Sequence, residues 1–449
     1  MFTKYFKISS IENSLRNLKY KKSLKFSVII KLLDVLIGLA LVPIFLHILG
    51  EEKYGLWLTI SSFTTMFFFL DGGLSQGLRN MLSESNAKGK ILKAQEYVST
   101  TYFFISVIGF LFSVITLIAV NYFDWSSIFN SSYDQLETIL VLLITGIVCQ
   151  LILNPINEIH KSFQKPYKSD LNKFLIRFLI LFGIIISTLF DEDDLFAVSL
   201  IHLLAPFLVL MFSSIFHFNT DYKFLKPRVN KIDFSLFSKI FGIGNKFLLI
   251  NLSLIIIFQT DNLIITNLFG PIEVTSYQIP NRIFLIPYTI FLILLSPLWS
   301  SSTEAYVKQD FLWIKKIVNK YLFFGFLFSI CILILVGISQ PLYRLWLGDN
   351  IDIPFRLSLL WGILYIVQIF IAIFFQVING ASKIRIQFYV YLFSLVLNIP
   401  LSLFFANYLK LGPSGVILAT ILCQVLHLLY LPNQYYKLVN NKLSGLWDS

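Results

Sequence analysis

Charge and cysteine are both scarce in this sequence of 449 residues. Asp, Glu, Lys and Arg make up 14% of the residues, hydrophobic residues make up 56%, and the mean hydropathy is +0.75. A soluble chain of this length would need a polar surface that this composition does not supply. The three cysteines lie in apolar stretches and the five histidines have no paired spacing, so neither a disulfide framework nor a metal site is predicted.

Motifs of enzymes and nucleotide-binding proteins are also missing. There is no Walker loop, so ATP is not expected to drive this protein directly, and "GIGNKF" at 242–247 lacks the third glycine of a dinucleotide fingerprint. No Ser/His/Asp set is suggested. We therefore expect no catalytic residues, no cofactor and no enzymatic activity. The net charge of +11 is attributed to basic residues that orient the protein in a membrane, so nucleic acid is not an expected partner.

Long apolar runs, in contrast, are abundant. A membrane-spanning helix needs about 20 apolar residues. The sequence therefore predicts an all-α polytopic membrane protein with 12 transmembrane helices, and the polar, basic segment before the first of them is not expected to be a cleaved signal peptide. The predicted spans are 27–49, 54–78, 98–121, 138–160, 174–190, 195–218, 243–268, 275–303, 317–337, 355–379, 387–406 and 414–436.

Lysine and arginine predict how these spans are oriented. Of the 36 basic residues, 27 lie in the N-terminal segment, the even-to-odd loops and the C-terminal segment, whereas the opposite loops hold only Lys53, Arg344 and Lys410. By the positive-inside rule, both termini are expected in the cytoplasm. The opposite loops are all short, so no domain is expected on that side.

The sequence also contains traces of an internal duplication. Three residues of the first half recur 220 positions later: Gly50, Glu84 and Lys88 match Gly270, Glu304 and Lys308. This register predicts two six-helix lobes related as parallel repeats, which is a transporter architecture. The expected boundaries are a cytoplasmic N-terminus at 1–26, an N-lobe at 27–218, a cytoplasmic linker at 219–239, a C-lobe at 240–436 and a cytoplasmic C-terminus at 437–449.

Charged residues inside the predicted spans are the candidates for function, because such groups are costly in a bilayer. Four cations stand out: Lys31, Arg79, Arg177 and Arg282. The first three are predicted at similar depth in the cytoplasmic half, and they are our candidates for contact with an anionic substrate. For Lys31, an alternative is that its apolar stem lets the ammonium reach the headgroups.

Two acidic residues of the first half are candidates for ion coupling or for ion pairs. Asp34 follows Lys31 by one helical turn on the same face, so the two could pair. Asp71 has no evident neighbour, and either Arg79 or the first helix would have to neutralise it. Two carboxylates at one depth would compete for one proton or cation.

A third acidic residue, Asp261, lies in "QTDNLIITNLFG" at 259–270. Asp261 and Arg282 each lie about two turns from the connection at 270–274, so they are expected at the same height. We predict that they form an ion pair across this hairpin, in a structural or a functional role. Asp261 is also a candidate for ion coupling.

Two stretches carry a resemblance to a known family. "LVPIFLHILGEEKYGLWLTISS" followed by "LDGGLSQGLRNMLSESNAKGK" resembles the opening helix pair of the polysaccharide transporter family, and "TDNLIITNLFGPIEVTSYQIPNRIF" resembles its seventh and eighth helices. These are the O-antigen and capsule repeat-unit flippases of the MATE-like MOP superfamily. The resemblance implies two six-helix lobes around a central cationic cavity, although Arg282 is the main deep cation in the second half.

The resemblance further implies a function. It implies a flippase of the bacterial inner membrane that moves undecaprenyl-pyrophosphate-linked oligosaccharide from the inner to the outer leaflet by alternating access, coupled to an ion gradient. The expected partners are this lipid-linked sugar, the lipid bilayer, and the polymerase and chain-length regulator of the same pathway. Arginine and lysine suit a pyrophosphate headgroup.

Two rival functions remain open at this point. A MATE-like drug/cation antiporter would share the lobes and the embedded carboxylates, but it would favour an acidic cavity. The second rival is an integral-membrane polysaccharide polymerase or glycosyltransferase, for which the glutamates of "GEEKYG" at 50–55 are possible catalytic acids. Such enzymes generally carry a large outer loop, which this sequence does not predict.

Overall fold

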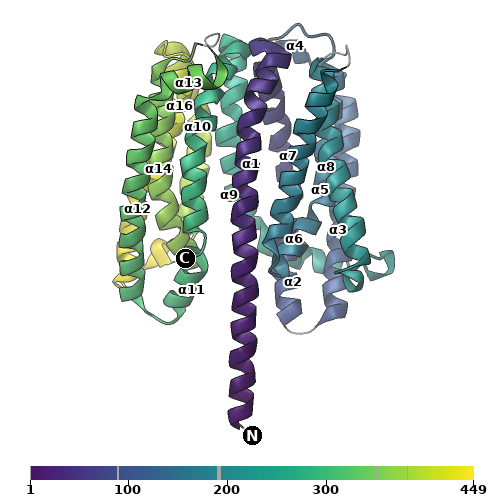
Figure 1. Cartoon of the computed structure of the whole chain (residues 1–449), viewed down its shortest axis with the longest axis vertical. Helices are drawn as coiled ribbons and strands as arrows, with labels where there is room; N and C mark the ends of the chain where they lie inside the picture. Colours follow the sequence, from purple (N-terminus) through teal and green to yellow (C-terminus); the bar gives the residue numbers. More distant parts are fainter. Residues whose placement is uncertain (1, 88–89, 190–193, 349–351, 382, 449) are drawn as a thin grey trace. The chain divides into compact units, whose positions relative to one another are not determined.

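The computed structural model describes residues 2–87, 90–189, 194–348, 352–381 and 383–448. Within these ranges it describes all side chains except those of 2–25, 87, 194, 239–251 and 300. The described chain is helical throughout and contains no strand (Figure 1). This confirms the predicted all-α fold. The helices divide into two compact units.

Unit 1 comprises residues 1–44, 67–125 and 133–248. Within it, α3, α5 and α8 pack side by side, and α7 packs on α8. The core lies where α2 and α6 meet α3 and is built from aliphatic and aromatic residues such as Leu78, Val98 and Tyr222. Its elements are the first part of α1 (Phe2–Met66), a 3-10 turn at Phe67–Asp71, α2 (Leu74–Ala87), α3 (Ile91–Ala119), α5 (Leu136–Leu153), α6 (Pro155–Ser162), α7 (Pro166–Ser187), α8 (Asp194–Asn219), 3-10 turns at Lys223–Leu225 and Val229–Lys231, and the start of α9 (Ser235–Phe269).

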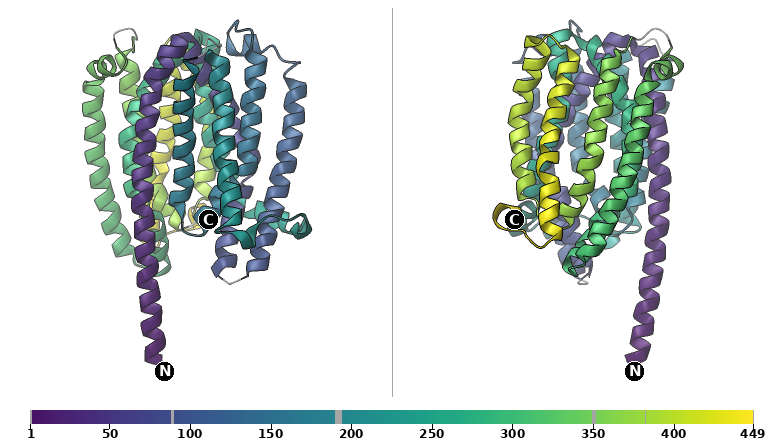
Figure 2. Two further views of the ribbon diagram at one scale, coloured as in Figure 1. Left: turned by 45° about the vertical axis from the view of Figure 1, so that its right-hand side comes forward. Right: turned by 90° about the vertical axis from the view of Figure 1, so that its left-hand side faces the viewer.

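Unit 2 comprises residues 45–66, 126–132 and 249–449. Here α14 and α16 are central, and α16 also packs along α15, beside which it is drawn in yellow in Figure 2. Its elements are the last part of α1, most of α4 (Trp125–Phe129), the rest of α9, α10 (Pro271–Leu295), α11 (Leu298–Val307), α12 (Phe311–Gly337), α13 (Ser339–Leu347), α14 (Phe355–Gly380), α15 (Arg385–Leu403), a π-helical turn at Phe404–Tyr408, α16 (Pro413–Val439) and a 3-10 turn at Gly445–Asp448.

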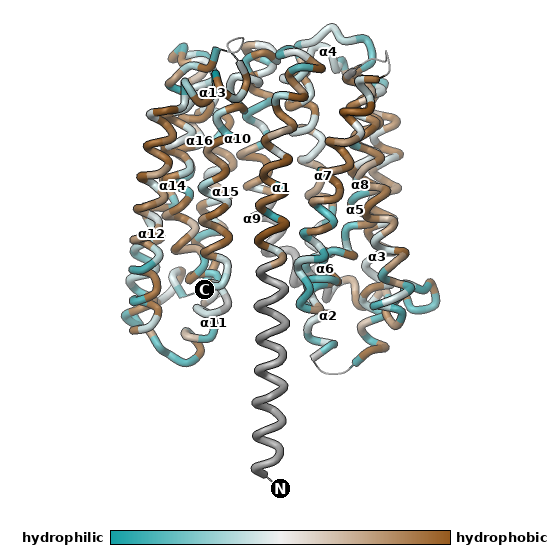
Figure 3. Tube along the Cα trace, viewed as in Figure 1, coloured by the Kyte–Doolittle hydropathy of each residue, from teal (hydrophilic) through white to brown (hydrophobic). Residues whose placement is uncertain are grey.

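Ten stretches of the described chain are long and apolar enough to cross a membrane. Figure 3 shows this apolar character as brown along most of α3 and α12. The first stretch, Phe26–Asp71, covers the first predicted span and most of the second. The predicted span at 174–190 corresponds to α7, which falls outside the ten because Asp170, Lys173 and Arg177 interrupt its apolar sequence. The described chain thus has ten such stretches, whereas the sequence predicts twelve spans.

The second predicted span, 54–78, is not one continuous helix. The α-helix ends at Met66, a 3-10 turn follows, and Gly72 and Gly73 have φ of 59° and 72°. Only then does α2 begin. Positive φ cannot continue a right-handed helix, and glycine adopts it without a Cβ penalty. Gly73 therefore precedes α2 while Gly77 lies within it, and the two do not belong to one continuous helix.

Two glycines at matching positions of the repeat have matching backbones. Gly50 interrupts α1 with φ 69° and ψ 174°, and Gly270 precedes α10 with φ 92° and ψ 164°. This region of φ and ψ is accessible essentially to glycine alone. The 220-residue offset therefore corresponds to one turn geometry used twice.

The helical segment 51–66 is fixed tightly within unit 2. A Cβ on Gly55 would lie 1.7 Å from the carbonyl oxygen of Pro271, so the backbones approach closely at this crossing. Thr275 donates to the carbonyl of Glu51 at 2.7 Å, and the hydroxyls of Thr59 and Thr266 lie 2.5 Å apart. These contacts bring the segment against α9 and α10, where it borders the cavity described next.

Candidate functional site

A cavity of about 690 Å³ opens within unit 2. Its walls come from the segment 51–66 and from α9, α10, α14 and α15. The size is in the usual range for small-molecule and cofactor sites. Polar side chains contribute much of the lining: Ser61, Ser62, Thr65, Gln259, Asn262, Gln278, Asn281, Arg282 and Gln368.

Amide side chains form a continuous hydrogen-bonded row along this cavity. Asn262 donates to the Ser62 hydroxyl at 2.7 Å, and Gln278 donates to the Asn262 oxygen at 2.7 Å. Asn281 donates to Gln278 at 2.7 Å, and the hydroxyl of Tyr365 donates to Asn281 at 2.5 Å. Each amide is thereby oriented by its neighbours, and the row offers both donors and acceptors at fixed positions.

Aromatic rings line the other part of the cavity. Trp361 and Tyr365 are stacked with 5.9 Å between ring centroids, and Tyr288 lies 5.2 Å from Tyr365. Trp361 is held by a hydrogen bond of 2.9 Å from its indole to the carbonyl of Tyr277. Phe258, Phe375 and Tyr391 complete the aromatic lining. Rings of this kind present flat apolar faces beside the polar row.

Arg282 is the one charged side chain among the described residues that line this cavity. Its guanidinium lies beside the Tyr54 hydroxyl, and its buried Nε has no hydrogen-bond partner. No described carboxylate lies within 4.0 Å of it. A positive charge on the cavity wall without an acidic partner among the described residues is suited to an anionic group of a ligand.

The structure does not bring Asp261 and Arg282 together, contrary to the predicted ion pair. Asp261 instead accepts hydrogen bonds from Tyr277 at 2.8 Å and from Thr420 at 3.1 Å. Although Asp261 and Asn262 are adjacent, successive residues of a helix point about 100° apart, so Asn262 faces the cavity while Asp261 faces α16. Asp261 is 2% exposed, and Asn398, which donates to Thr420, leaves its own buried carbonyl oxygen without a partner.

The predicted residues of α1 lie in unit 1, each paired with α7. Arg177 donates to Asp34 at 2.8 Å and to its carbonyl oxygen at 2.9 Å, whereas Lys31 lies 3.9 Å from Asp170. Lys31 and Asp34 therefore pair with another helix and not with each other. The Arg177 and Lys31 side chains keep 39% and 47% of their surface exposed, so both cations remain accessible.

The predicted residues of the second span are positioned by α2. Asp71 accepts from the backbone N–H and the hydroxyl of Ser75, at 3.3 and 2.6 Å, and so caps the start of α2. This is neither of the partners that the sequence suggested. Arg79 lies 4.0 Å from Glu158, which also accepts from Lys161 at 2.5 Å.

The amide row is the feature that sequence reasoning missed. Its members lie inside predicted spans, where Asn and Gln are expensive unless they are hydrogen-bonded. Only the charged residues of the predicted spans are named as candidates, yet the neutral amides at 259, 262, 278, 281 and 368, three of which form the row, are a signal of equal quality.

Comparisons with known proteins agree with this architecture. The MatE family model matches residues 247–404. The chain carries a MatE domain. The whole chain has the fold of solved MATE transporters, so the predicted family resemblance is confirmed at the level of this domain and this fold.

The relatives of this chain among curated proteins are distant. A Salmonella typhimurium protein named "Putative O-antigen transporter" is 21% identical over 389 residues, which cover 86% of this chain and 89% of that protein. A Yersinia pseudotuberculosis protein named "Putative O-antigen export protein" is 24% identical over 339 residues, which cover 74% of this chain and 76% of that one.

Solved structures of MATE transporters share its fold. An inward-facing multidrug resistance MATE family transporter of the MOP superfamily superposes with a TM-score of 0.75 at 16% identity, covering 92% of this chain and 96% of the other. An outward-facing multidrug resistance MATE family transporter gives 0.66 at 15% identity, with 95% and 97% covered.

Proposed function

We propose that this transporter is a flippase that moves undecaprenyl-pyrophosphate-linked oligosaccharide, an O-antigen or capsule repeat unit, from the inner to the outer leaflet of the bacterial inner membrane. One observation carries the proposal. The described lining of the cavity in unit 2 combines a row of amides, stacked aromatic rings and one cation, Arg282. Names of two distant relatives point the same way.

This combination matches the chemistry of a sugar phosphate better than that of a cationic drug. Hydroxyl groups of a sugar are both donors and acceptors, as are the amides of Asn262, Gln278 and Asn281. The apolar faces of sugar rings pack on aromatic side chains such as Trp361. A cationic drug would instead have Arg282 as its one charged neighbour among the described lining residues, and like charges repel.

The cations of unit 1 fit a second part of the same proposal. Arg177, Lys31 and Arg79 are each paired with a carboxylate and yet keep accessible surface. An arginine with unused donors can bind phosphate oxygens while one of its edges remains on a carboxylate. We assign these three cations to contact with the pyrophosphate on the cytoplasmic side, where both termini are proposed to lie.

Ion coupling belongs to the proposal as well, with the three embedded carboxylates as candidates. Asp261 is supported most directly, because it is buried in unit 2 and its surroundings supply neutral oxygen and hydroxyl groups from Tyr277, Thr420 and Asn398. Asp34 and Asp71 are engaged by Arg177 and by the start of α2. Transport should respond to an imposed H⁺ or Na⁺ gradient in the wild-type protein and less in Asp261→Asn.

The test of the proposal uses the full chain in proteoliposomes that contain a fluorescent undecaprenyl-pyrophosphate oligosaccharide. A lectin added outside reports how much sugar reaches the outer leaflet. Asn262→Ala and Arg282→Gln should slow this transfer at least tenfold, whereas Leu333→Ala, an exposed residue of α12, should not. Transfer at the wild-type rate in both cavity variants would refute the proposal.

A cation/drug antiporter is the second candidate, and the buried carboxylate of Asp261 favours it. The same vesicles discriminate between the two functions. If a gradient drives accumulation of ethidium and Asp261→Asn abolishes it, while the lipid-linked sugar does not compete, the chain is an antiporter. Absence of ethidium transport together with sugar transfer supports the flippase.

A further inference from the structure

A second hollow lies in unit 1, along the seam between α7 and α8, with a volume of about 510 Å³. Its walls are mainly leucine and phenylalanine, including Leu171, Leu175 and Leu179 from α7 and Leu208 and Phe212 from α8. Lys168, Asn172, Ser213 and His217 also line it. We call it the α7–α8 groove.

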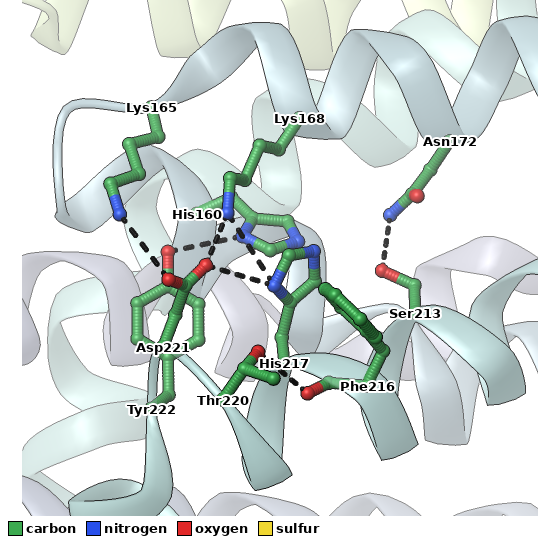
Figure 4. Close-up of polar contacts among 10 residues, drawn as sticks. All are labelled: His160, Lys165, Lys168, Asn172, Ser213, Phe216, His217, Thr220, Asp221 and Tyr222. Atoms are coloured by element: carbon green, nitrogen blue, oxygen red, sulfur yellow. Dashed lines mark hydrogen bonds and ion pairs between the residues drawn. The ribbon is translucent and has the colours of Figure 1, made fainter.

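The basic end of this groove is an organised cluster, drawn in Figure 4. Lys168 donates to the Asp221 carboxylate, and its ammonium lies 3.4 Å from Nδ1 of His217. Nδ1 of His217 lies 3.0 Å from the same carboxylate, and Lys165 lies 4.0 Å from it. Asn172 donates to Ser213 at 3.0 Å, where the groove continues inward.

The charges of this cluster do not cancel. The hydrogen bond from Lys168 is the main cause that holds the pKa of Asp221 below its usual value, so this carboxylate is ionised at neutral pH. One negative charge then faces two ammonium groups, Lys165 and Lys168. An ammonium has three donors, and the one of Lys168 that Asp221 and His217 do not use is available to an anion.

The apolar part of the groove faces outward. Leu208 is 47% exposed and Phe212 is 70% exposed, so these side chains meet lipid in a membrane protein. From Lys168 to Leu179, α7 rises about 16 Å, which is close to half of a hydrocarbon core of about 30 Å. The groove thus has the length of one leaflet and one charged end.

We propose that the α7–α8 groove binds one anionic phospholipid of the inner leaflet, with its phosphate on Lys168 and Lys165 and an acyl chain along Leu171, Leu175 and Phe212. The positive-inside pattern assigns the end at 161–173 to the cytoplasm, which is the leaflet this geometry requires. The inference rests on unit 1 alone and is independent of the transported substrate.

Native mass spectrometry of the full-length protein in detergent tests this site. The probes are phosphatidylglycerol and phosphatidylcholine with identical acyl chains. We expect phosphatidylglycerol to bind with at least tenfold higher affinity. The double variant Lys165→Gln/Lys168→Gln should bind phosphatidylglycerol with about tenfold lower affinity. The control variant Lys316→Gln/Lys320→Gln, which removes two exposed charges from α12, should bind it with unchanged affinity.

A steric variant tests the apolar part. Leu208→Trp should lower phosphatidylglycerol occupancy, whereas Leu333→Trp on the exposed face of α12 should leave it unchanged. Equal binding of both lipids, or an unchanged affinity in the double lysine variant, would overturn the proposal. So would displacement of the lipid by millimolar inorganic phosphate, which would show headgroup binding alone, or tighter binding of a polyprenyl phosphate than of phosphatidylglycerol.

Discussion

At the scale of single residues, the sequence identifies the charged residues inside the predicted spans but not the residues with which they pair. Lys31 was matched with Asp34 because they are one turn apart, yet each pairs with α7. Asp261 was matched with Arg282 because both lie at the same height, yet they point to different surroundings. Helical spacing fixes height and relative direction within one helix. It does not fix the rotation of that helix against its neighbours, and this rotation decides which charges meet.

The separation of Asp261 from Arg282 predicts how charge-swapped variants behave. If the proposed function holds, Asp261→Asn and Arg282→Gln should each impair polysaccharide export, because one alters a buried carboxylate and the other removes a cation of the cavity. The double variant Asp261→Arg/Arg282→Asp should recover nothing, since the two side chains are not partners. Surface polysaccharide per folded transporter measures this outcome, with Arg282→Lys as a control that keeps the charge. Partial recovery in the swapped variant would restore the ion-pair hypothesis.

The contact between Arg177 and Asp34 predicts a measurable coupling in stability. Arg177→Gln leaves the partly buried Asp34 carboxylate, whose Oδ1 already lacks a partner, without its cation. Because both side chains retain some exposure, we expect a loss of about 1–2 kcal/mol in unfolding free energy. The double variant Asp34→Asn/Arg177→Gln should lose less than the sum of the single variants. Thermal unfolding in detergent checks this, and strict additivity would show that the two groups do not interact.

At the scale of elements, the apolar runs of the sequence predict where most spans lie. The points at which helices are interrupted depend instead on proline and glycine. Helices are interrupted at two prolines: α6 begins at Pro155, and α11 begins directly after Pro297. The break at Gly72 and Gly73 was not predicted, because hydropathy continues through the preceding 3-10 turn and a glycine pair is compatible with a helix. Positive φ is a conformational property that an apolar pattern does not reveal.

Gly55 predicts the sharpest effect of adding one methyl group. Its Cβ would lie 1.7 Å from the Pro271 carbonyl oxygen, which is backbone and cannot rotate away, so Gly55→Ala should abolish the folded protein or shift α10. Gly337→Ala is the matched control, because a Cβ there meets nothing within 4 Å and alanine favours a helix. The yield of monodisperse protein after purification compares the two. A wild-type yield for Gly55→Ala would contradict this close approach.

At the scale of the whole molecule, composition alone predicted a helical membrane protein, and the fold and the MatE match bear this out. The cavity that carries the proposed function was less accessible to prediction. It is built from five helical segments far apart in the sequence, and its chemistry depends on neutral amides that become meaningful only when they are adjacent. The sequence predicts twelve spans because each apolar run is taken as a separate span.

The distribution of basic residues predicts the orientation of the whole chain. In a variant with Cys149, Cys331 and Cys423 replaced by alanine, Arg228→Cys should react with a membrane-impermeant maleimide only after the cells are permeabilised. Asp134→Cys should react in intact cells, since its loop is predicted on the outer side. Both positions are exposed in the structure. The opposite labelling pattern would invert the assigned topology and the leaflet of the α7–α8 groove.

The pairing of α1 with α7 has a consequence for biogenesis. Asp34 and Arg177 are 143 residues apart, so the ribosome must synthesise three further predicted spans before α7 emerges. Until then, the α1 carboxylate has no cation from α7 to neutralise it, and α7 itself carries four charged side chains into the insertion machinery. The two helices should therefore integrate stably only as a pair, with α1 retained near the translocon until its partner arrives.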